Sequence, residues 1–210
     1  MFDFVGSPVP IRPDLRYAYI NTWSHFARPG PSLTGAQRVG LLSAVRRGDA
    51  SSTVDSTWFG PAVGQLAQIL YSKPSTMHGS IVAAAVEEAG DPTTVKVIGL
   101  VSMLAAVDGT HRALGSELEP LPAPEPGSPT GAIADGLKRR RTHIPVPPGP
   151  IPVVLDLLPD EGAAFQAMFG PQYMTGWEMA LDDFRRQPGL NRAQMEIVSS
   201  RTSMHNECFY

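Results

Sequence analysis

The stretch that decides the fold is "DPTTVKVIGLVSMLAAVDGTHRALG", residues 91–115. Asp91 and Pro92 form a helix start signal, because an aspartate caps the first turn and proline suits the first helical position. The run from Val95 to Val107 is almost wholly apolar, which predicts a buried helix. A helix that spans a bilayer needs about 20 apolar residues. This run is shorter, so it indicates the core of a soluble protein.

Further helices are predicted on the N-terminal side of this stretch. Thr34 is available as an N-cap for the first, Pro74 ends the second, and Gly90 is the expected C-cap of the third. No comparable run of alternating residues suggests a sheet. The fold class is therefore expected to be all-α. The three helices cover residues 33–47, 60–72 and 76–90, and the first should bury Val39, Leu42 and Val45.

A proline-rich connection divides the chain. Ten of the 21 prolines lie in residues 117–152, and proline lacks the N–H that a helix or a sheet requires. We expect an N-terminal helical lobe over 1–116 and a C-terminal helical lobe over 153–210. The basic run "LKRRR" (137–141) can bind phosphates, but a solvated face of the linker is the favoured interpretation.

Three helices are predicted after the linker. The first begins at Pro159, and the last, over 188–203, has Asn191 as a plausible cap. Between them, residues 175–187 show helical spacing of apolar side chains. The inward face expected of this middle helix consists of Trp177, Ala180, Leu181 and Phe184.

The two lobes share a short pattern. Leu33, Ala36 and Gln37 align with Leu190, Ala193 and Gln194, each set following a Trp, a Phe and a Pro-Gly breaker. An ancestral duplication explains this pattern, and so does chance similarity between amphipathic helices. On the alignment Val39 stands where the second lobe has Glu196, so the first lobe lacks that carboxylate.

Composition excludes several classes of function. A net charge of −3 and a pI near 5.9 give no reason to expect nucleic acid or an anionic membrane as partner. The N-terminal stretch has Asp3 where an export signal is basic. The single cysteine cannot form an internal disulfide, which fits a cytoplasmic protein. The histidines lack ligand spacing and no nucleotide-binding motif occurs, so neither a metal nor a cofactor is expected.

The candidate catalytic residues are Glu196 and Cys208. They are twelve positions apart, which on one unbroken helix is about 18 Å of rise. They meet only if the helix ends between them, at His205-Asn206, and the chain folds back. Asn206 would then cap a new helix with Cys208 in its first turn, where the positive end of the helix dipole favours the thiolate. The neighbouring Glu207 opposes this effect.

Glu196, Ser203, Asn206, Cys208 and Tyr210 resemble the signature E…S-x-x-N-x-C-x-Y-C-x-x-x-H of alkylhydroperoxidase D-like proteins, in the carboxymuconolactone decarboxylase superfamily. Residues 78–109 and 151–181 also look similar to helices of that superfamily. The resemblance implies an all-α homo-oligomer. It also implies an antioxidant enzyme that reduces peroxides with a pair of cysteines, a glutamate, a histidine and a thiol or dithiol reductant.

Carried over to this chain, the resemblance makes Cys208 the first cysteine and Glu196 the proton-relay carboxylate. The second cysteine, which attacks the peroxide in the best-known members, would directly follow Tyr210. We expect that the sequence breaks off inside the redox motif; a truncated gene product and a member without catalysis are the alternatives. Two other functions stay open: a cofactor-free decarboxylase of the same superfamily and a non-catalytic helical oligomer. The Asn-x-Cys-x-Tyr pattern favours the peroxidase.

Overall fold

The computed structural model describes residues 1–50, 58–148, 153–174, 176–185 and 189–205. Within these ranges the regular structure is helical, apart from one isolated bridge between Lys138 and Val146. This confirms the predicted all-α fold class. The helices are α1 (Pro13–Ala27), α2 (Gly35–Arg47), α4 (Pro61–Ser72), α5 (Gly79–Ala113), α6 (Pro159–Gln172), α7 (Gly176–Met179) and α8 (Arg192–His205), with 3-10 turns η1 (Pro74–Thr76) and η2 (Val154–Leu157).

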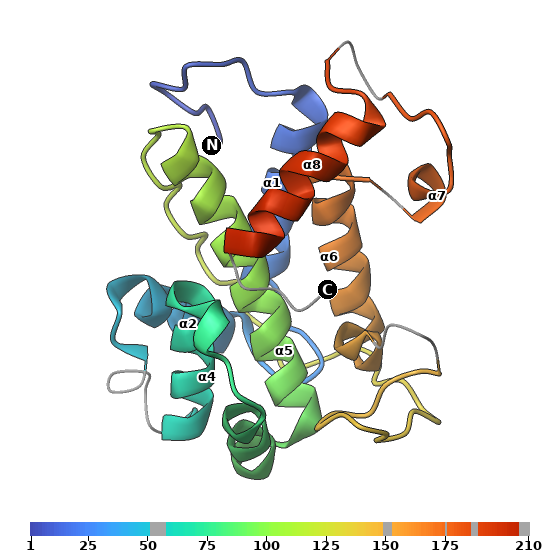
Figure 1. Ribbon diagram of the computed structural model, residues 1–210. Helices are drawn as coiled ribbons and strands as arrows, with labels where there is room; N and C mark the ends of the chain where they lie inside the picture. The colour runs from blue at the N-terminus through green and yellow to red at the C-terminus, as the bar shows by residue number, and fades with distance from the viewer. Residues whose placement is uncertain (51–57, 149–152, 175, 186–188, 206–210) are drawn as a thin grey trace.

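Helix α5 runs through the middle of the molecule, and the other helices are arranged around it (Figure 1). It bends at Gly90, whose φ of 79° and ψ of 167° lie outside the helical region. This left-handed conformation suits a residue without Cβ. The helix break predicted at Gly90 is therefore confirmed. Asp91, predicted to cap the next helix, does not do so, because its Oδ2 pairs with Arg139 and its Oδ1 has no hydrogen-bond partner among the described residues.

By length and composition α5 is also the one described helix that could cross a membrane, with a mean hydropathy of 1.3 over its most apolar window. Within that window 61% of the residues are buried inside the protein. A mostly buried core helix of a soluble protein passes the same test.

The main hydrophobic core lies between α5 and helices α1, α2 and α4. Tyr19 and Phe26 of α1, Leu41 of α2, Leu66 of α4 and Leu104 of α5 are each fully buried there. Helix α4 packs along α5, and its N-terminal amides at Ala62 and Val63 donate to the carboxylate of Glu88. The apolar faces predicted from helical spacing therefore meet in one core.

Helix α2 begins as the sequence predicts and buries two of the three residues predicted to point inward. Thr34 forms a capping box with Gln37, in which each side chain accepts from the other residue's backbone N–H. Val39, predicted to be inward, is only half-buried, whereas Arg38 is 1% exposed. Leu42 and Val45 are 0% exposed, as predicted. The burial of Arg38 was not predicted, because apolar spacing alone does not place an arginine in the interior.

The proline-rich segment lies against the helices. Trp23 donates through Nε1 to the carbonyl of Pro120 at 2.7 Å, and the Glu125 amide donates to the Ala27 carbonyl at 2.8 Å. Farther along, Ala134 donates to Leu157 at 2.9 Å. Hydrogen bonds to and from its backbone therefore hold this extended segment against the helices.

Helix α6 belongs to the predicted C-terminal lobe yet packs against α1 and α5 of the N-terminal lobe. Pro159 occupies its first turn, as predicted. Tyr19 of α1 reaches Gln172 near the end of α6 with its hydroxyl, at 3.2 Å. Figure 1 shows α6 beside α1 and α5.

The helix predicted over 175–187 is wrong in the described part of that segment. Helix α7 covers only Gly176–Met179, and Trp177, expected to point inward, is 74% exposed. Phe184 is buried, as predicted. Short helices are unstable in water without burial of an apolar face, and Trp177 and Ala180 of the predicted face are both exposed.

Candidate functional site

Helix α8 carries the predicted relay carboxylate. It begins with a capping box in which the Gln194 amide donates to Asn191 Oδ1 at 3.0 Å and the Asn191 amide donates to Gln194 Oε1 at 2.9 Å. The predicted cap at Asn191 is thus confirmed. Helix α2 starts with the same device at Thr34 and Gln37, so the alignment between the lobes coincides with matching helix starts. The duplication itself stays a prediction.

Glu196 lies one turn into α8 and is held by two neighbours. The Tyr173 hydroxyl donates to its Oε2 at 3.0 Å, and Arg192 Nε lies 3.8 Å from its Oε1. The side chain is 43% exposed. The carboxylate is therefore oriented by a phenol that follows α6, and it stays in contact with water.

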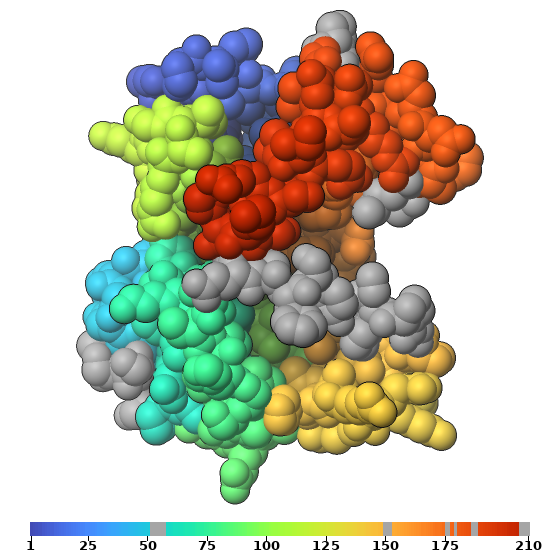
Figure 2. All heavy atoms as spheres, viewed as in Figure 1, coloured from blue at the N-terminus to red at the C-terminus, as the bar shows by residue number. Residues whose placement is uncertain are grey.

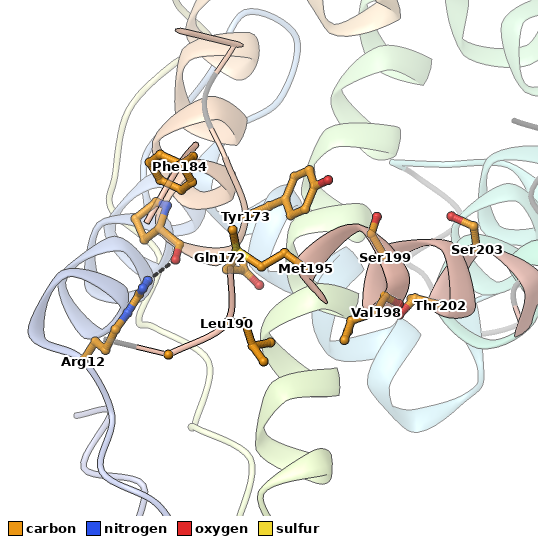
Figure 3. Close-up of a pocket in the computed structure, with 12 residues that line it drawn as sticks. Arg12, Gln172, Tyr173, Phe184, Leu190, Met195, Val198, Ser199, Thr202 and Ser203 are labelled. Atoms are coloured by element: carbon orange, nitrogen blue, oxygen red, sulfur yellow. Dashed lines mark hydrogen bonds between the residues drawn. The ribbon is translucent and has the colours of Figure 1, made fainter. Parts of the chain in front are cut away.

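A pocket of about 590 Å³ lies between α8, the end of α6 and the start of α1 (Figure 3). Arg12 closes one side, where its guanidinium donates to the Pro171 carbonyl. The Tyr173 that binds Glu196 lines the same pocket. A volume of this size suits a small organic molecule. The lining is apolar at Phe184, Leu190, Met195 and Val198 and carries hydroxyls at Ser199, Thr202 and Ser203.

Cys208, Asn206 and Tyr210 lie outside the described residues, so the predicted approach of Cys208 to Glu196 is not placed. Helix α8 extends to His205, nine residues or about 13 Å of rise beyond Glu196. Three extended residues span about 11 Å at most. Only a chain that doubles back after His205 brings the thiol near the carboxylate.

A second group of polar side chains is buried between α1, α2, α5 and α6. Glu161 of α6 is 0% exposed, and its Oε2 accepts from Lys96 of α5 and lies 3.0 Å from His25 Nε2 of α1. Lys96 is also fully buried. Arg38 of α2 completes the group, which we call the Glu161 cluster, and donates to the Arg28 carbonyl at 2.5 Å.

Burial and charge act in opposite directions within the Glu161 cluster. Burial by itself raises the pKa of Glu161, but His25, Lys96 and Arg38 together favour the ionised form and hold the pKa below its ordinary value. Burial is also the largest influence on His25 and Lys96, and it lowers the pKa of both. Glu161 is therefore an ionised carboxylate among buried basic groups.

Sequence reasoning missed the Glu161 cluster. One signal was available: Lys96 stands between Val95 and Val97 in the most apolar run of the chain, and a buried lysine needs a charge partner. A second sign is visible only in the structure. A Cβ at Gly99 would lie 2.5 Å from Glu161 Cγ, so the glycine lets the carboxylate approach α5.

The Glu161 cluster predicts a loss of stability in acid. The pKa values of His25 and Glu161 lie below their ordinary values of 6.5 and 4.5, so the unfolded chain binds more protons than the folded one. The stability due to His25 falls as the pH drops below 6.5, and that due to Glu161 falls below 4.5. Urea unfolding between about pH 7.5 and pH 5 should show the part of this decline that is due to His25.

The matched variant for the acid prediction is His25→Gln, which keeps a hydrogen-bonding side chain but cannot titrate. Its free energy of unfolding should change less between the same two pH values. An equally steep decline in this variant would show that another group causes it.

The described residues contain no group of three or more His, Cys, Asp or Glu side chains that could hold a metal ion. The Glu161 cluster has one carboxylate among basic groups, which is a poor donor set for a cation. Comparison of the chain with models of protein families, with curated proteins and with solved structures found no match.

Proposed function

We propose that this chain carries part of a thiol-dependent peroxidase site of the alkylhydroperoxidase D-like type. Cys208 supplies one thiol, and Glu196 moves the proton. The observation that carries the proposal is the hydrogen bond between Glu196 and Tyr173, because Tyr173 lines the 590 Å³ pocket. A relay carboxylate needs a fixed position beside the space that the substrate occupies.

The chemistry balances as a two-electron reduction. A thiolate attacks one peroxide oxygen, an S–O bond forms, the O–O bond breaks, and the departing oxygen takes a proton to become an alcohol or water. A second thiol then attacks the sulfur of the sulfenic acid, which releases water and leaves a disulfide. A dithiol reductant restores both thiols. Glu196 accepts the proton of the attacking thiol and returns it to the departing oxygen.

The lining of the pocket supports this assignment. Tyr173 fixes one carboxylate oxygen of Glu196, and the other lies 3.8 Å from Arg192 at the water-exposed side. Ser199, Thr202 and Ser203 follow on the same helix and offer hydroxyls to a polar substrate group. The apolar side of the pocket receives the organic part of the substrate.

Partners and location follow from the same proposal. The substrates are a small peroxide and a thiol or dithiol reductant, with no nucleic acid, membrane or cofactor. A free thiol in use fits the cytoplasm. The enzyme is proposed to work as a homo-oligomer.

The test extends the chain so that it carries the full signature. In a chain extended past Tyr210 by Cys-Ala-Ala-Ala-His, we expect peroxide turnover with a dithiol reductant, which Cys208→Ser abolishes. Glu196→Gln should cut that turnover at least about 10-fold, the low end for general acid–base help. In the unextended chain Cys208 should alkylate readily yet give no turnover.

Glu207→Gln is the matched control for Glu196→Gln. It removes a carboxylate next to Cys208 that opposes thiolate formation, so alkylation of Cys208 should become faster rather than slower. Full peroxide turnover in the extended Glu196→Gln chain would remove Glu196 from the mechanism. A Cys208 no more reactive than glutathione at the same pH would contradict an activated thiol.

A further inference from the structure

One face of α8 carries small and apolar side chains, with one serine, and has no partner within the described residues. Ala193, Ile197, Ser200 and Met204 are all exposed, Ile197 by 70% and Met204 by 67%. Their spacing of four, three and four residues is that of a coiled-coil seam, in which apolar or small residues repeat every 3.5 positions. None of the residues of α8 is buried. We call these four residues the α8 seam.

The opposite face of α8 lines the pocket described above. Met195, Val198, Ser199 and Thr202 line the pocket toward the body of the protein (Figure 3). The helix itself lies across the surface in the view of Figure 2, with its atoms on the outside of the molecule. The α8 seam therefore packs against none of the described residues and is available to meet another helix.

Two charged residues flank the α8 seam. Glu196 precedes Ile197 on one edge, and Arg201 follows Ser200 on the other. When two such helices pair in parallel and in register, each residue at the first edge meets the residue five positions later on the partner. Glu196 then faces Arg201 of the partner subunit, twice by symmetry. In an antiparallel pair the edge that carries Glu196 faces the same edge of the partner helix, and the edge that carries Arg201 does likewise. That arrangement brings like charges together.

We propose that the α8 seam binds the α8 seam of a second copy of this chain, as a parallel pair about a two-fold axis. Both carboxylate oxygens of Glu196 have contacts already, but the Arg192 contact at 3.8 Å is long, which leaves room for a second guanidinium. Arg201 is exposed and has no ion-pair partner among the described residues. The paired helices place a residue of each copy beside Glu196 of the other.

The association is expected to be weak. Four residues on each side bury less than the roughly 1,200 Å² that marks stable interfaces. The dimer should therefore form and dissociate with concentration. This inference does not rest on the thiol chemistry, because association is measured without any turnover, and either proposal can fail alone.

The first experiment measures association by sedimentation velocity between about 1 and 200 μM. The chain should form a dimer over this range, and Ile197→Asp should raise the dissociation constant at least about 10-fold. Val198→Asp is the matched control, because it places the same charge on α8 away from the seam, and it should associate as the parent chain does. A parent chain that stays monomeric, or an equal loss in both variants, would overturn the proposal.

The second experiment tests direction and register in the Cys208→Ser background. Ser200→Cys should form a cross-linked dimer on oxidation, whereas Thr202→Cys, on the pocket face, should not. Arg201→Glu should weaken association, and Glu196→Arg combined with Arg201→Glu should restore it. Failure of the exchanged pair to restore association would exclude the parallel arrangement.

Discussion

Glu161→Gln is expected to lower the free energy of unfolding by about 3–5 kcal/mol, the usual effect of removing one partner of a buried ion pair. The substitution keeps the size of the side chain but removes its charge. Lys96, which is 0% exposed, and Arg38, which is 1% exposed, then lose their buried counter-charge. Denaturant unfolding of the two proteins at pH 7 measures the difference.

Two further variants make this result specific. Glu87→Gln removes a carboxylate from the exposed side of α5 and should change stability by less than about 0.5 kcal/mol. Lys96→Met combined with Glu161→Gln should recover part of the loss, because a buried cation is removed together with its partner. If Glu161→Gln unfolds within 1 kcal/mol of the parent chain, the carboxylate is not buried among cations.

Local signals in the sequence predicted the helix boundaries well. Thr34, Gly90 and Asn191 act through contacts with residues three or four positions away, or through their own backbone angles. Such effects need no knowledge of the fold. The all-α class follows from the same kind of evidence, since the period of apolar residues is a local property.

The Glu161 cluster could not be found in this way. Lys96 and Glu161 are 65 positions apart, and His25 and Glu161 are 136 positions apart. A helical period shows that a position faces inward, but it does not show which residue from a distant part of the chain contacts it. The sequence therefore predicts that Lys96 needs a partner and leaves the partner open.

Two other segments depart from what their local sequence favours. Residues 175–187 carry an amphipathic pattern, yet only Gly176–Met179 are helical and Trp177 is exposed. Near the N-terminus, Phe2 and Phe4 are buried with φ of 56° and 48°, a conformation that phenylalanine rarely adopts. Packing against Trp23 and His111 holds them. The exposed Trp177 leaves the short helix without packing, whereas aromatic contacts hold Phe2 and Phe4 in their unusual backbone conformation.

The sequence proposes Glu196 as a site residue but does not reveal the pocket near it. The sequence selected Glu196, and the structure places it beside a pocket-lining tyrosine. The pocket itself depends on Arg12, Pro171 and Phe184, which come from three separate segments. No motif connects these segments, because the pocket is formed by packing rather than by spacing along the chain.

Asp108→Asn is expected to destabilise the protein by about 3 kcal/mol, through loss of a buried charge pair. Asp108 is 0% exposed and accepts from Arg46 Nη2 at 2.6 Å and Nε at 2.9 Å, and from the Tyr71 hydroxyl at 2.6 Å. It thereby joins α5 to α2 and α4. An asparagine offers one oxygen where the carboxylate offered two, and its amide turns a donor toward other donors.

The Asp108→Asn substitution also affects Arg46, the ion-pair partner of Asp108. Arg46 is 15% exposed, lies 5.6 Å from the Trp23 ring centroid and donates to the Glu119 carbonyl at 2.8 Å. It cannot leave for water without breaking these contacts, so its charge stays partly buried and uncompensated. Asp3→Asn is the matched control, because the pair of Asp3 with Arg16 is exposed by 61% and 47%. That control should cost less than about 1 kcal/mol. If both variants lose the same free energy of unfolding, the Asp108–Arg46 pair contributes no more than a surface ion pair. If only Asp108→Asn loses stability, the buried pair holds α2, α4 and α5 together.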